Sequence, residues 1–326
     1  MGGLGRVVAL GGGTGLPALL EAIKPAAGAP GCFDGVTAVV TVADSGGSSG
    51  RLRREMGVPA PGDIRNCLVA LSDAPEVLRR LFQYRFVQGE LEGHSLGNLF
   101  LAALAEVAGD FPSGVRQVHD ILAIRGRIVP STARPVELVA VMGDGAELRG
   151  EWDITRDPRP IRRLRLDPPD CAALPEACEA LRAADLILLG PGSLYTSVLP
   201  NLLVRDLAAA IRTSRARKVY LCNLATQPGE TDGFSASDHA RVLLDHCDEG
   251  LFDTVLCNSA PLPPSLDRLY AGSGSRPVPV DADALRGLGL AVVAQDLLGT
   301  GEYARHDPVK LRSALVRLAQ TAVEKP

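Results

Sequence analysis

The stretch RVVALGGGTGLPALLEAI (residues 6–23) places a short apolar run, a glycine-rich turn and a helical pattern directly after one another. Continuous apolarity within Arg6–Leu10 is typical of a strand buried on both faces of a parallel sheet. In Leu16–Ile23 apolar residues return every three or four positions, which indicates a helix with one buried face. The order of strand, glycine turn and helix therefore favours an α/β fold.

The same alternation recurs along the chain. Apolar runs predict further strands at Val36–Val42, Leu186–Leu189, Lys218–Cys222 and Thr254–Cys257. Helical periodicity predicts helices at Ile64–Leu71, Glu76–Phe82, Leu96–Val107, Glu176–Ala183, Leu203–Thr213, Ala236–Asp245 and Val309–Ala322. We therefore predict a single three-layer α/β/α domain over residues 1–326, with a mostly parallel sheet.

The pattern changes between residues 128 and 166. Val136–Met142, Glu147–Ile154 and Ile161–Leu166 read as short strands joined by turns, which predicts a small β-rich insertion at about 128–166. Residues 261–279 are rich in proline, glycine and serine, and we predict a long surface loop there.

Composition excludes several classes of function. A net charge of −4 in 326 residues argues against a nucleic-acid partner, because phosphate neutralisation needs a basic excess. No lysine lies in a glycine-rich stretch, so a P-loop is excluded. Seven cysteines without a C-x-x-C pair and five histidines without ligand spacing predict reduced thiols and no metal ligand set. No apolar run approaches the roughly 18 residues of a membrane span, so we expect a soluble, cytoplasmic protein.

Two loops that follow the first two predicted strands are candidates for phosphate binding. Gly12, Gly13, Thr14 and Gly15 form the first, and G-x-G-x-x-A at residues 13–18 satisfies a loose dinucleotide fingerprint. The second, ADSGGSSGR (residues 43–51), contains Asp44, Ser45 and Arg51. It suits a phosphate nest, and Asp44 with Arg51 and Arg53 suits an NADP site equally well. A protease nucleophile at Ser45 is disfavoured, because that motif acts in another fold.

Two further loops open predicted helices. In PGDIRN (residues 61–66), Asp63 or Gly62 suits a helix cap, whereas Arg65 and Asn66 suit an anion. In GHSLGN (residues 93–98), Ser95 suits a helix N-cap and Asn98 suits recognition of a ligand or loop.

Tight turns and polar residues also follow the later strands. LGPGSLYTS (residues 189–197) supplies Gly192, Ser193 and Tyr195, and Asn223 and Thr226 follow the next strand. Because ligands bind at the carboxyl edge of parallel sheets, this turn and the first glycine turn could face one nucleotide.

These ordered motifs, together with TQPGET (residues 226–231), resemble those of the bacterial gluconeogenesis factor (YvcK-like) family. That family is related to the CofD-like 2-phospho-L-lactate transferases of deazaflavin-cofactor biosynthesis. The resemblance implies a Rossmann-like fold, a cytoplasmic location and binding of a nucleotide sugar such as UDP-N-acetylglucosamine or UDP-glucose. It also implies a role in cell shape and envelope synthesis during gluconeogenic growth.

Two residues depart from the family pattern. Ser45 stands where relatives usually keep a second acid, and Pro308 follows Asp307 where a hydroxyl residue is expected. Ser45 leaves Asp44 as the sole carboxylate of its loop, which favours binding over catalysis.

The leading hypothesis is a regulatory protein that binds a nucleotide sugar. Gly12, Gly13, Thr14, Gly15, Gly192 and Ser193 would hold the diphosphate, Arg65 would add charge-assisted bonds, and Asn223 and Arg305 would contact base, ribose or sugar. The alternative is a transferase in which Asp44 positions or deprotonates an acceptor hydroxyl and Mg²⁺ bridges phosphates. An NADP-dependent dehydrogenase is a third reading, and it lacks a Tyr-x-x-x-Lys pair. A homodimer and a partner enzyme from envelope synthesis or central metabolism stay open.

Overall fold

A seven-stranded, wholly parallel sheet forms the centre of the computed structural model, which describes residues 3–247, 249–301 and 303–323. Its spatial order is β10-β9-β8-β7-β1-β2-β3. The strands are β1 (Arg6–Gly11), β2 (Gly35–Val40), β3 (Arg127–Pro130), β7 (Leu186–Leu189), β8 (Arg217–Leu221), β9 (Thr254–Asn258) and β10 (Ala291–Gln295). The five strands predicted from continuous apolarity are all present, and β1 and β7 lie at the buried centre.

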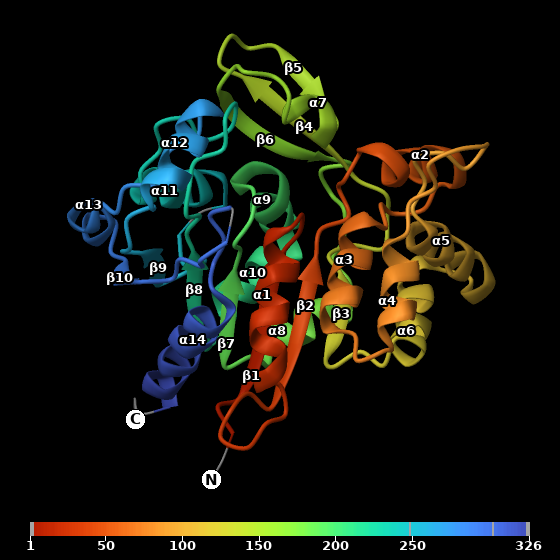
Figure 1. Ribbon diagram of the computed structural model, residues 1–326, viewed down its shortest axis with the longest axis horizontal. Coiled ribbons are helices and arrows are strands. Elements are labelled where there is room, and N and C mark those ends of the chain that lie inside the picture. Colours follow the sequence, from red (N-terminus) through yellow and green to blue (C-terminus); the bar gives the residue numbers. More distant parts are fainter. Residues whose placement is uncertain (1–2, 248, 302, 324–326) are drawn as a thin grey trace.

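Helices cover both faces of this sheet, so the predicted three-layer α/β/α fold is confirmed (Figure 1). Helices α1, α3 and α14 lie in front of it in Figure 1, and α8 and α10 lie behind it. Helices α4, α5 and α6 pack together beyond the β3 edge. The longer helices are α1 (Gly15–Ile23), α2 (Gly47–Met56), α3 (Gly62–Leu71), α4 (Glu76–Gln83), α5 (Leu96–Ala108), α6 (Phe111–Ile121), α8 (Pro175–Arg182), α10 (Arg205–Thr213), α11 (Ala236–Cys247), α12 (Pro264–Gly272) and α14 (Pro308–Val323). The shorter ones are α7 (Glu151–Ile154), α9 (Leu199–Leu202) and α13 (Ala282–Gly287).

The strand order reverses direction between β1 and β7. From β1 the chain moves outward through β2 to β3, and it then returns to β7 on the other side of β1 and continues through β8 and β9 to β10. Open α/β sheets bind ligands in the crevice at such a switch point, outside the carboxyl ends of the strands. The topology therefore directs attention to the turns that follow β1 and β7.

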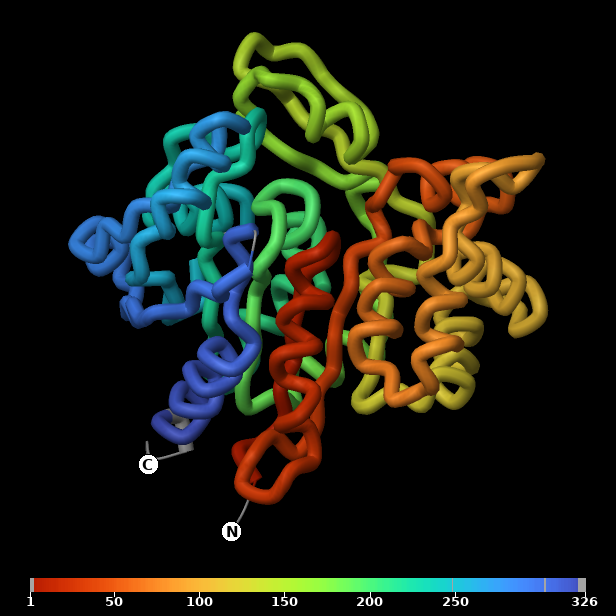
Figure 2. The backbone as a smooth tube through the Cα atoms, viewed as in Figure 1, coloured from red at the N-terminus to blue at the C-terminus, as the bar shows by residue number. Residues whose placement is uncertain are grey.

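A second, antiparallel sheet of three strands stands apart from the main sheet, drawn in yellow-green in Figure 2. It has the order β5-β4-β6, formed by β4 (Glu137–Met142), β5 (Glu147–Arg149) and β6 (Ile161–Asp167). We call residues 137–167 the insertion. Within the range where the sequence pattern changes, Arg127–Pro130 belongs instead to the main sheet as its edge strand.

Two predictions of local structure are wrong. The predicted strand Glu147–Ile154 ends at Arg149, because Gly150 adopts a φ of 87° and α7 begins at the next residue. The predicted loop at residues 261–279 contains α12, whose single buried residue, Leu266, leaves no apolar period to detect.

Helix α2 was not predicted, because its buried face carries Ser48, Ser49 and Gly50 beside only one apolar residue, Leu52. The predicted helix Leu203–Thr213 is present as α10, which begins two residues later, at Arg205. Within the described residues, none of these helices combines the length and apolarity needed to cross a bilayer.

Candidate functional site

A cleft of about 500 Å³ opens at the switch point, outside the carboxyl ends of β1, β7 and β8. Its walls come from segments that lie far apart in the sequence, as expected at such a crevice. Nine predicted site residues line it: Gly13, Thr14, Gly15, Asn66, Gly192, Ser193, Asn223, Thr226 and Arg305. The structure thus brings together most of the residues that the hypothesis assigned to a diphosphate and its nucleoside.

The turn after β1 packs directly against the turn after β7. A Cβ atom on Gly15 would clash with the Pro191 carbonyl oxygen, and Gly13 adopts a φ of 58°. Glycine is the residue that tolerates both the close approach and the positive φ. Thr14 occupies the N-cap position of α1, and its exposed hydroxyl makes no cap bond. Leu16 donates its N–H to the Gly12 carbonyl at 3.3 Å and Pro17 has no N–H, so the Gly15 N–H and the Thr14 hydroxyl are the donors that this helix start can offer to an anion.

Asn223 holds the second turn in shape. Its side-chain NH₂ donates to the Gly192 carbonyl at 2.9 Å, and its amide oxygen accepts from the Gly192 N–H at 3.2 Å. Both functions of the amide are thus used on the backbone. Asn223 lines the cleft, but it acts by positioning Gly192.

Ser193 is likewise bound within the protein. Its hydroxyl donates to the Glu230 carboxylate at 2.7 Å and accepts from the Thr196 N–H at 3.0 Å. Glu230 is 5 % exposed, and burial raises the pKa of its carboxyl group. The Ser193 hydroxyl therefore caps the π-helical turn Leu194–Val198, although Ser193 is a lining residue of the cleft.

The opposite wall joins Thr226, Tyr270, Arg305 and His306. Thr226 Oγ1 accepts from the Arg276 N–H at 3.0 Å, and Tyr270 OH accepts from the Ala304 N–H at 3.0 Å. Arg305 is exposed at the rim. Burial lowers the pKa of His306 to about 4, and its Nε2 has no partner. An aromatic ring, a guanidinium group and a neutral imidazole therefore lie along one side of the cleft.

Two carboxylates meet behind the glycine turn. Asp63 accepts a hydrogen bond from the Gly13 N–H, and burial, then the charge of Asp44, raises its pKa to about 7. Cβ atoms on Gly12 and Gly62 would meet Asp63 Oδ2 and Asp44 Oδ2 at 2.5 and 2.6 Å. Glycine at both positions therefore leaves space for the two carboxylates. The prediction that Asp63 caps the helix is wrong, because α3 begins at Gly62 and Pro61 is its N-cap.

Ser45 connects the Asp44 loop to the insertion. Its hydroxyl accepts from the Trp152 N–H at 2.9 Å, and its own N–H donates to the Glu151 carboxylate. Burial, followed by the charges of Asp44 and Asp63, raises the pKa of Glu151 to about 7. Asp44 is thus the sole carboxylate of its loop, but two more acids lie within electrostatic reach of it.

Asn66 lines the cleft, whereas its neighbour Arg65 is buried near the acid pair and is not a lining residue. Arg65 Nη2 donates to Asn66 Oδ1 at 2.7 Å, and its buried Nε has no partner. Burial first, and the charge of Arg85 second, lower the pKa of Arg65. A buried cation with an unused donor is an energetic cost that a bound anion would offset.

Other predicted residues lie away from the cleft. Arg51 Nη2 donates to the Glu92 carbonyl at 2.6 Å, and Asn98 Nδ2 donates to Ser49 Oγ at 3.3 Å. Arg53 pairs with Glu137 at 2.9 Å, so the NADP reading loses both arginines proposed for a 2′-phosphate. Ser95 occupies the N-cap position of α5, but its hydroxyl donates to the Phe82 carbonyl instead of capping.

Tyr195 is buried and has no place in the cleft lining. Its OH donates to the Ile161 carbonyl of β6 at 3.4 Å, which ties the turn after β7 to the insertion. It acts as a packing residue.

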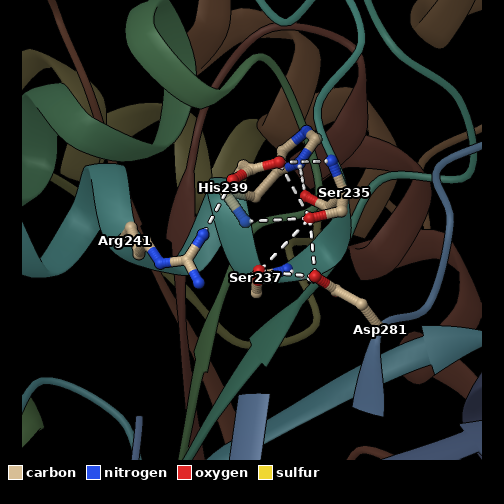
Figure 3. A network of polar contacts seen from close by, with 6 residues as sticks. Ser235, Ser237, His239, Arg241 and Asp281 are labelled. Carbon is tan, nitrogen blue, oxygen red and sulfur yellow. Dashed lines mark hydrogen bonds and ion pairs between the residues drawn. The ribbon is translucent and has the colours of Figure 1, made fainter. Parts of the chain in front are cut away.

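The polar cluster at the start of α11 is structural (Figure 3). Ser235 Oγ lies 2.8 Å from a carboxylate oxygen of Asp238 and of Asp281 and donates its single proton to one of them, and the Ser237 N–H donates to Asp281 at 2.9 Å. His239 Nδ1 bonds to the Ser235 carbonyl at 2.8 Å. These bonds satisfy the free N–H groups of the helix start.

Sequence reasoning missed Tyr270, Glu230, His306, Glu151 and the buried role of Asp63. Glu230 and His306 lie in or beside the quoted motifs and could have been chosen. Tyr270 lies in the segment predicted as a loop, and nothing in the sequence marks it.

Comparisons with known proteins agree with the resemblance. Residues 7–298 match the family described as 2-phospho-L-lactate transferase CofD. The chain is 45 % identical to the gluconeogenesis factor of Halalkalibacterium halodurans over 95 % of both chains. It is 44 % identical to the gluconeogenesis factor of Bacillus subtilis, over 98 % of this chain and 99 % of that one. The crystal structure of a UPF0052 family member from Bacillus halodurans superimposes with a TM-score of 0.92 at 45 % identity, covering 97 % of this chain and 100 % of that one.

Proposed function

The chain belongs to the gluconeogenesis factor family within the CofD superfamily, and from this premise we propose that it is a regulatory protein whose cleft binds a nucleotide sugar. The observation that carries the proposal is the cleft at the β1/β7 switch point, where two glycine turns face each other. UDP-N-acetylglucosamine and UDP-glucose are the ligands that we propose.

The diphosphate would lie against the first turn. The Gly15 N–H and the exposed Thr14 hydroxyl would supply donors, since Thr14 makes no cap bond, the Leu16 N–H is bonded to the Gly12 carbonyl and Pro17 has no N–H. Arg65, with its unused Nε, would supply positive charge from the side of Asn66. Gly12 supports this arrangement from behind by leaving room for Asp63.

The nucleoside or sugar would lie along the opposite wall. Tyr270 offers a ring face, Arg305 offers a guanidinium group at the rim, and His306 Nε2 can accept a hydrogen bond. Together these groups would distinguish a nucleotide sugar from inorganic phosphate.

Calorimetric titration with UDP-N-acetylglucosamine tests the proposal. We expect binding by the wild-type chain and a loss of about tenfold or more in affinity for Arg305→Ala, because a charge-assisted hydrogen bond contributes about 1.5–3 kcal/mol. Arg286→Ala is the matched control, since Arg286 pairs with Asp283 on its own helix, away from the cleft lining. No binding at millimolar ligand, with binding of GDP or NADP⁺ instead, contradicts the proposal.

The cellular role that we propose is control of cell shape and envelope synthesis during gluconeogenic growth. A strain that lacks the gene should lose its shape on a gluconeogenic carbon source and regain it with the wild-type chain. If Arg305→Ala abolishes ligand binding and still restores shape, the role does not depend on the cleft.

A divalent cation fits beside the phosphates, and this is part of the proposal. Mg²⁺ is commonly bound by one or two carboxylates together with substrate phosphates, and Asp44 and Asp63 are two such carboxylates in mutual repulsion. Within the described part of the chain, no group of three or more His, Cys, Asp or Glu residues is arranged for a metal ion. Mg²⁺ would therefore bind with the nucleotide, and would strengthen its binding in the wild type but not in Asp44→Asn.

A transferase activity is the second candidate, favoured by the same acid pair. Asp44 would position the acceptor hydroxyl and Mg²⁺ would neutralise charge on the phosphates. The test is turnover of a guanylylated phospholactate donor with a deazaflavin acceptor. Undetectable turnover by the folded wild-type chain with Mg²⁺ rejects this candidate and leaves the binding proposal intact.

A further inference from the structure

A second concave site lies between the insertion and the helices that follow β7, away from the cleft. We call it the arginine groove. It has a volume of about 370 Å³ and shares none of its lining residues with the cleft. Its walls are strand β6, the α9–α10 segment and the last residues of α11, and β6 runs past α9 in Figure 1. The groove is therefore open to a molecule that contacts the insertion and the main domain together.

The floor of the groove is apolar and its rim is basic. Leu164, Leu166, Leu202 and Ala208 are buried and form the floor. The rim is formed by four arginines: Arg163, Arg165, Arg205 and Arg212. No Asp or Glu is among the described residues that line the groove, although the chain carries a net charge of −4.

Three of these guanidinium groups have no carboxylate partner in the described part of the chain. Arg163 donates to the Asp245 carbonyl at 2.8 Å, and Arg212 donates to the Cys247 carbonyl at 2.9 Å. Arg205 makes no hydrogen bond or ion pair with any described residue. Only Arg165 is neutralised, by Glu147 at 3.2 Å.

Stabilisation of the α11 terminus explains part of this arrangement. Arg163 and Arg212 satisfy carbonyl groups near the end of that helix, where cations are favourable. Each uses one of its five N–H donors in doing so, and the remaining donors are free for another partner. Stabilisation of the end of α11 does not explain the presence of Arg205, which is the first residue of α10 and lines the other wall.

Apart from Glu147, no acid in the described part of the chain forms an ion pair with a rim arginine. Asp206, the residue after Arg205, accepts from the Ala173 N–H at 3.1 Å and is not a lining residue. The His246 imidazole is neutral, because its Nε2 accepts a hydrogen bond from the Leu164 N–H at 3.0 Å and burial lowers its pKa. Counted over the described residues that line the groove, the net charge is therefore positive.

We propose that the arginine groove binds a small organic phosphate as a second ligand. Arginine presents paired N–H groups that match phosphate oxygens, and like charges that surround one cavity are stabilised when a dianion enters. The volume lies in the range of small-molecule sites, and the apolar floor suits a non-polar part of a metabolite such as a ring or a short chain. The proposal does not depend on a ligand in the cleft.

Calorimetric titration of the full chain with pyrophosphate, with the double variant Arg163→Ala/Arg205→Ala, tests this site. We expect the double variant to lose a binding event, or to weaken it by about tenfold or more, while Arg305→Ala retains it. The matched control is Arg241→Ala/Arg286→Ala, which removes two arginines that pair with Asp238 and Asp283. Binding at the groove should also weaken as salt concentration rises.

Three outcomes overturn the proposal. The first is pyrophosphate binding by Arg163→Ala/Arg205→Ala equal to wild type. The second is a single binding event that disappears only in Arg305→Ala. The third is a hexaglutamate peptide that binds through Arg163 and Arg205 where pyrophosphate does not, since this identifies an acidic protein partner. If thermal unfolding shows that the double variant does not fold, Arg205→Ala alone gives the same test, because its guanidinium group has no hydrogen bond or ion pair with a described residue to lose.

Discussion

Replacing Asp63 with asparagine should make the protein more stable at alkaline pH than the wild type. The carboxyl group is held between the Gly13 N–H and the charge of Asp44, and its pKa is raised from 3.8 to about 7. Asparagine keeps an oxygen that can accept from Gly13 and has nearly the same shape, but it cannot ionise. The substitution therefore removes one buried charge and little else.

The raised pKa gives the size and the sign of the effect. A shift of about three pKa units corresponds to about 4 kcal/mol as an upper limit, and the partial solvent contact of Asp63 reduces it to about 1–3 kcal/mol. Because the folded-state pKa lies above the unfolded one, the native state binds the extra proton between about pH 4 and pH 7. The wild type loses stability as the pH rises through that window, and Asp63→Asn does not.

Urea unfolding at about pH 5 and about pH 8 measures this difference. The stability of Asp63→Asn relative to wild type should rise by about 1–2 kcal/mol over this interval, which covers about two of the three pKa units, or by about 1.5–3 °C in Tm. Asp267→Asn, an exposed acid on α12, is the control and should show no such change. Asp44→Asn should reduce the effect without abolishing it, because burial is the larger cause of the shift. A relative stability that is constant or falls with pH refutes the description of Asp63 as a buried, repelled acid.

Three further predictions concern the surroundings of the cleft. Ser45→Ala removes the acceptor for the Trp152 N–H and should lower the local stability of the insertion by about 1 kcal/mol, measured as faster hydrogen exchange at residues 150–155. Unchanged exchange would show that this bond does not hold the insertion to the Asp44 loop. Gly15→Ala should lower the free energy of unfolding by about 1–3 kcal/mol, because the new Cβ clashes with the Pro191 carbonyl oxygen; Gly272→Ala, at a helical glycine without a positive φ and with open space around its Cβ, is the control. As the pH falls from about 6.5 to 4.5, His306→Gln should lose less stability than the wild type. The pKa of His306 is about 4 in the folded state, so the unfolded state binds the proton first in this range. An unaltered pH dependence argues against a buried neutral imidazole.

Sequence patterns were sufficient to predict the strands that are buried on both faces and the helices that bury one apolar face. The strands β1, β2, β7, β8 and β9 are continuous apolar runs because both faces of the sheet are covered. Helix α2 shows the opposite case, since its buried face carries serine and glycine and its exposed face carries arginine. A segment that packs through small polar residues has no apolar period to detect.

The cleft was predicted in outline, because glycine turns after parallel strands must converge on one edge. The roles of single residues were harder to predict. Asn223 and Ser193 have the chemistry of ligand contacts, yet their hydrogen bonds go to Gly192 and Glu230. Long-range partners of this kind are set by tertiary packing, which no local pattern encodes. Whether each cleft residue binds the ligand stays a prediction for titration.

The seam between Ser45 and the insertion has a consequence for engineering and for the comparison of relatives. The carboxylate of Glu151 belongs to a segment about 100 positions away in sequence, yet it bonds to the Ser45 N–H beside Asp44. A chimaera in which residues 137–167 are exchanged would therefore change the charge near Asp44 as well as the insertion itself. When relatives are aligned, the number of acids in the Asp44 loop alone does not give the charge of the site, because Glu151 of the insertion contributes to it.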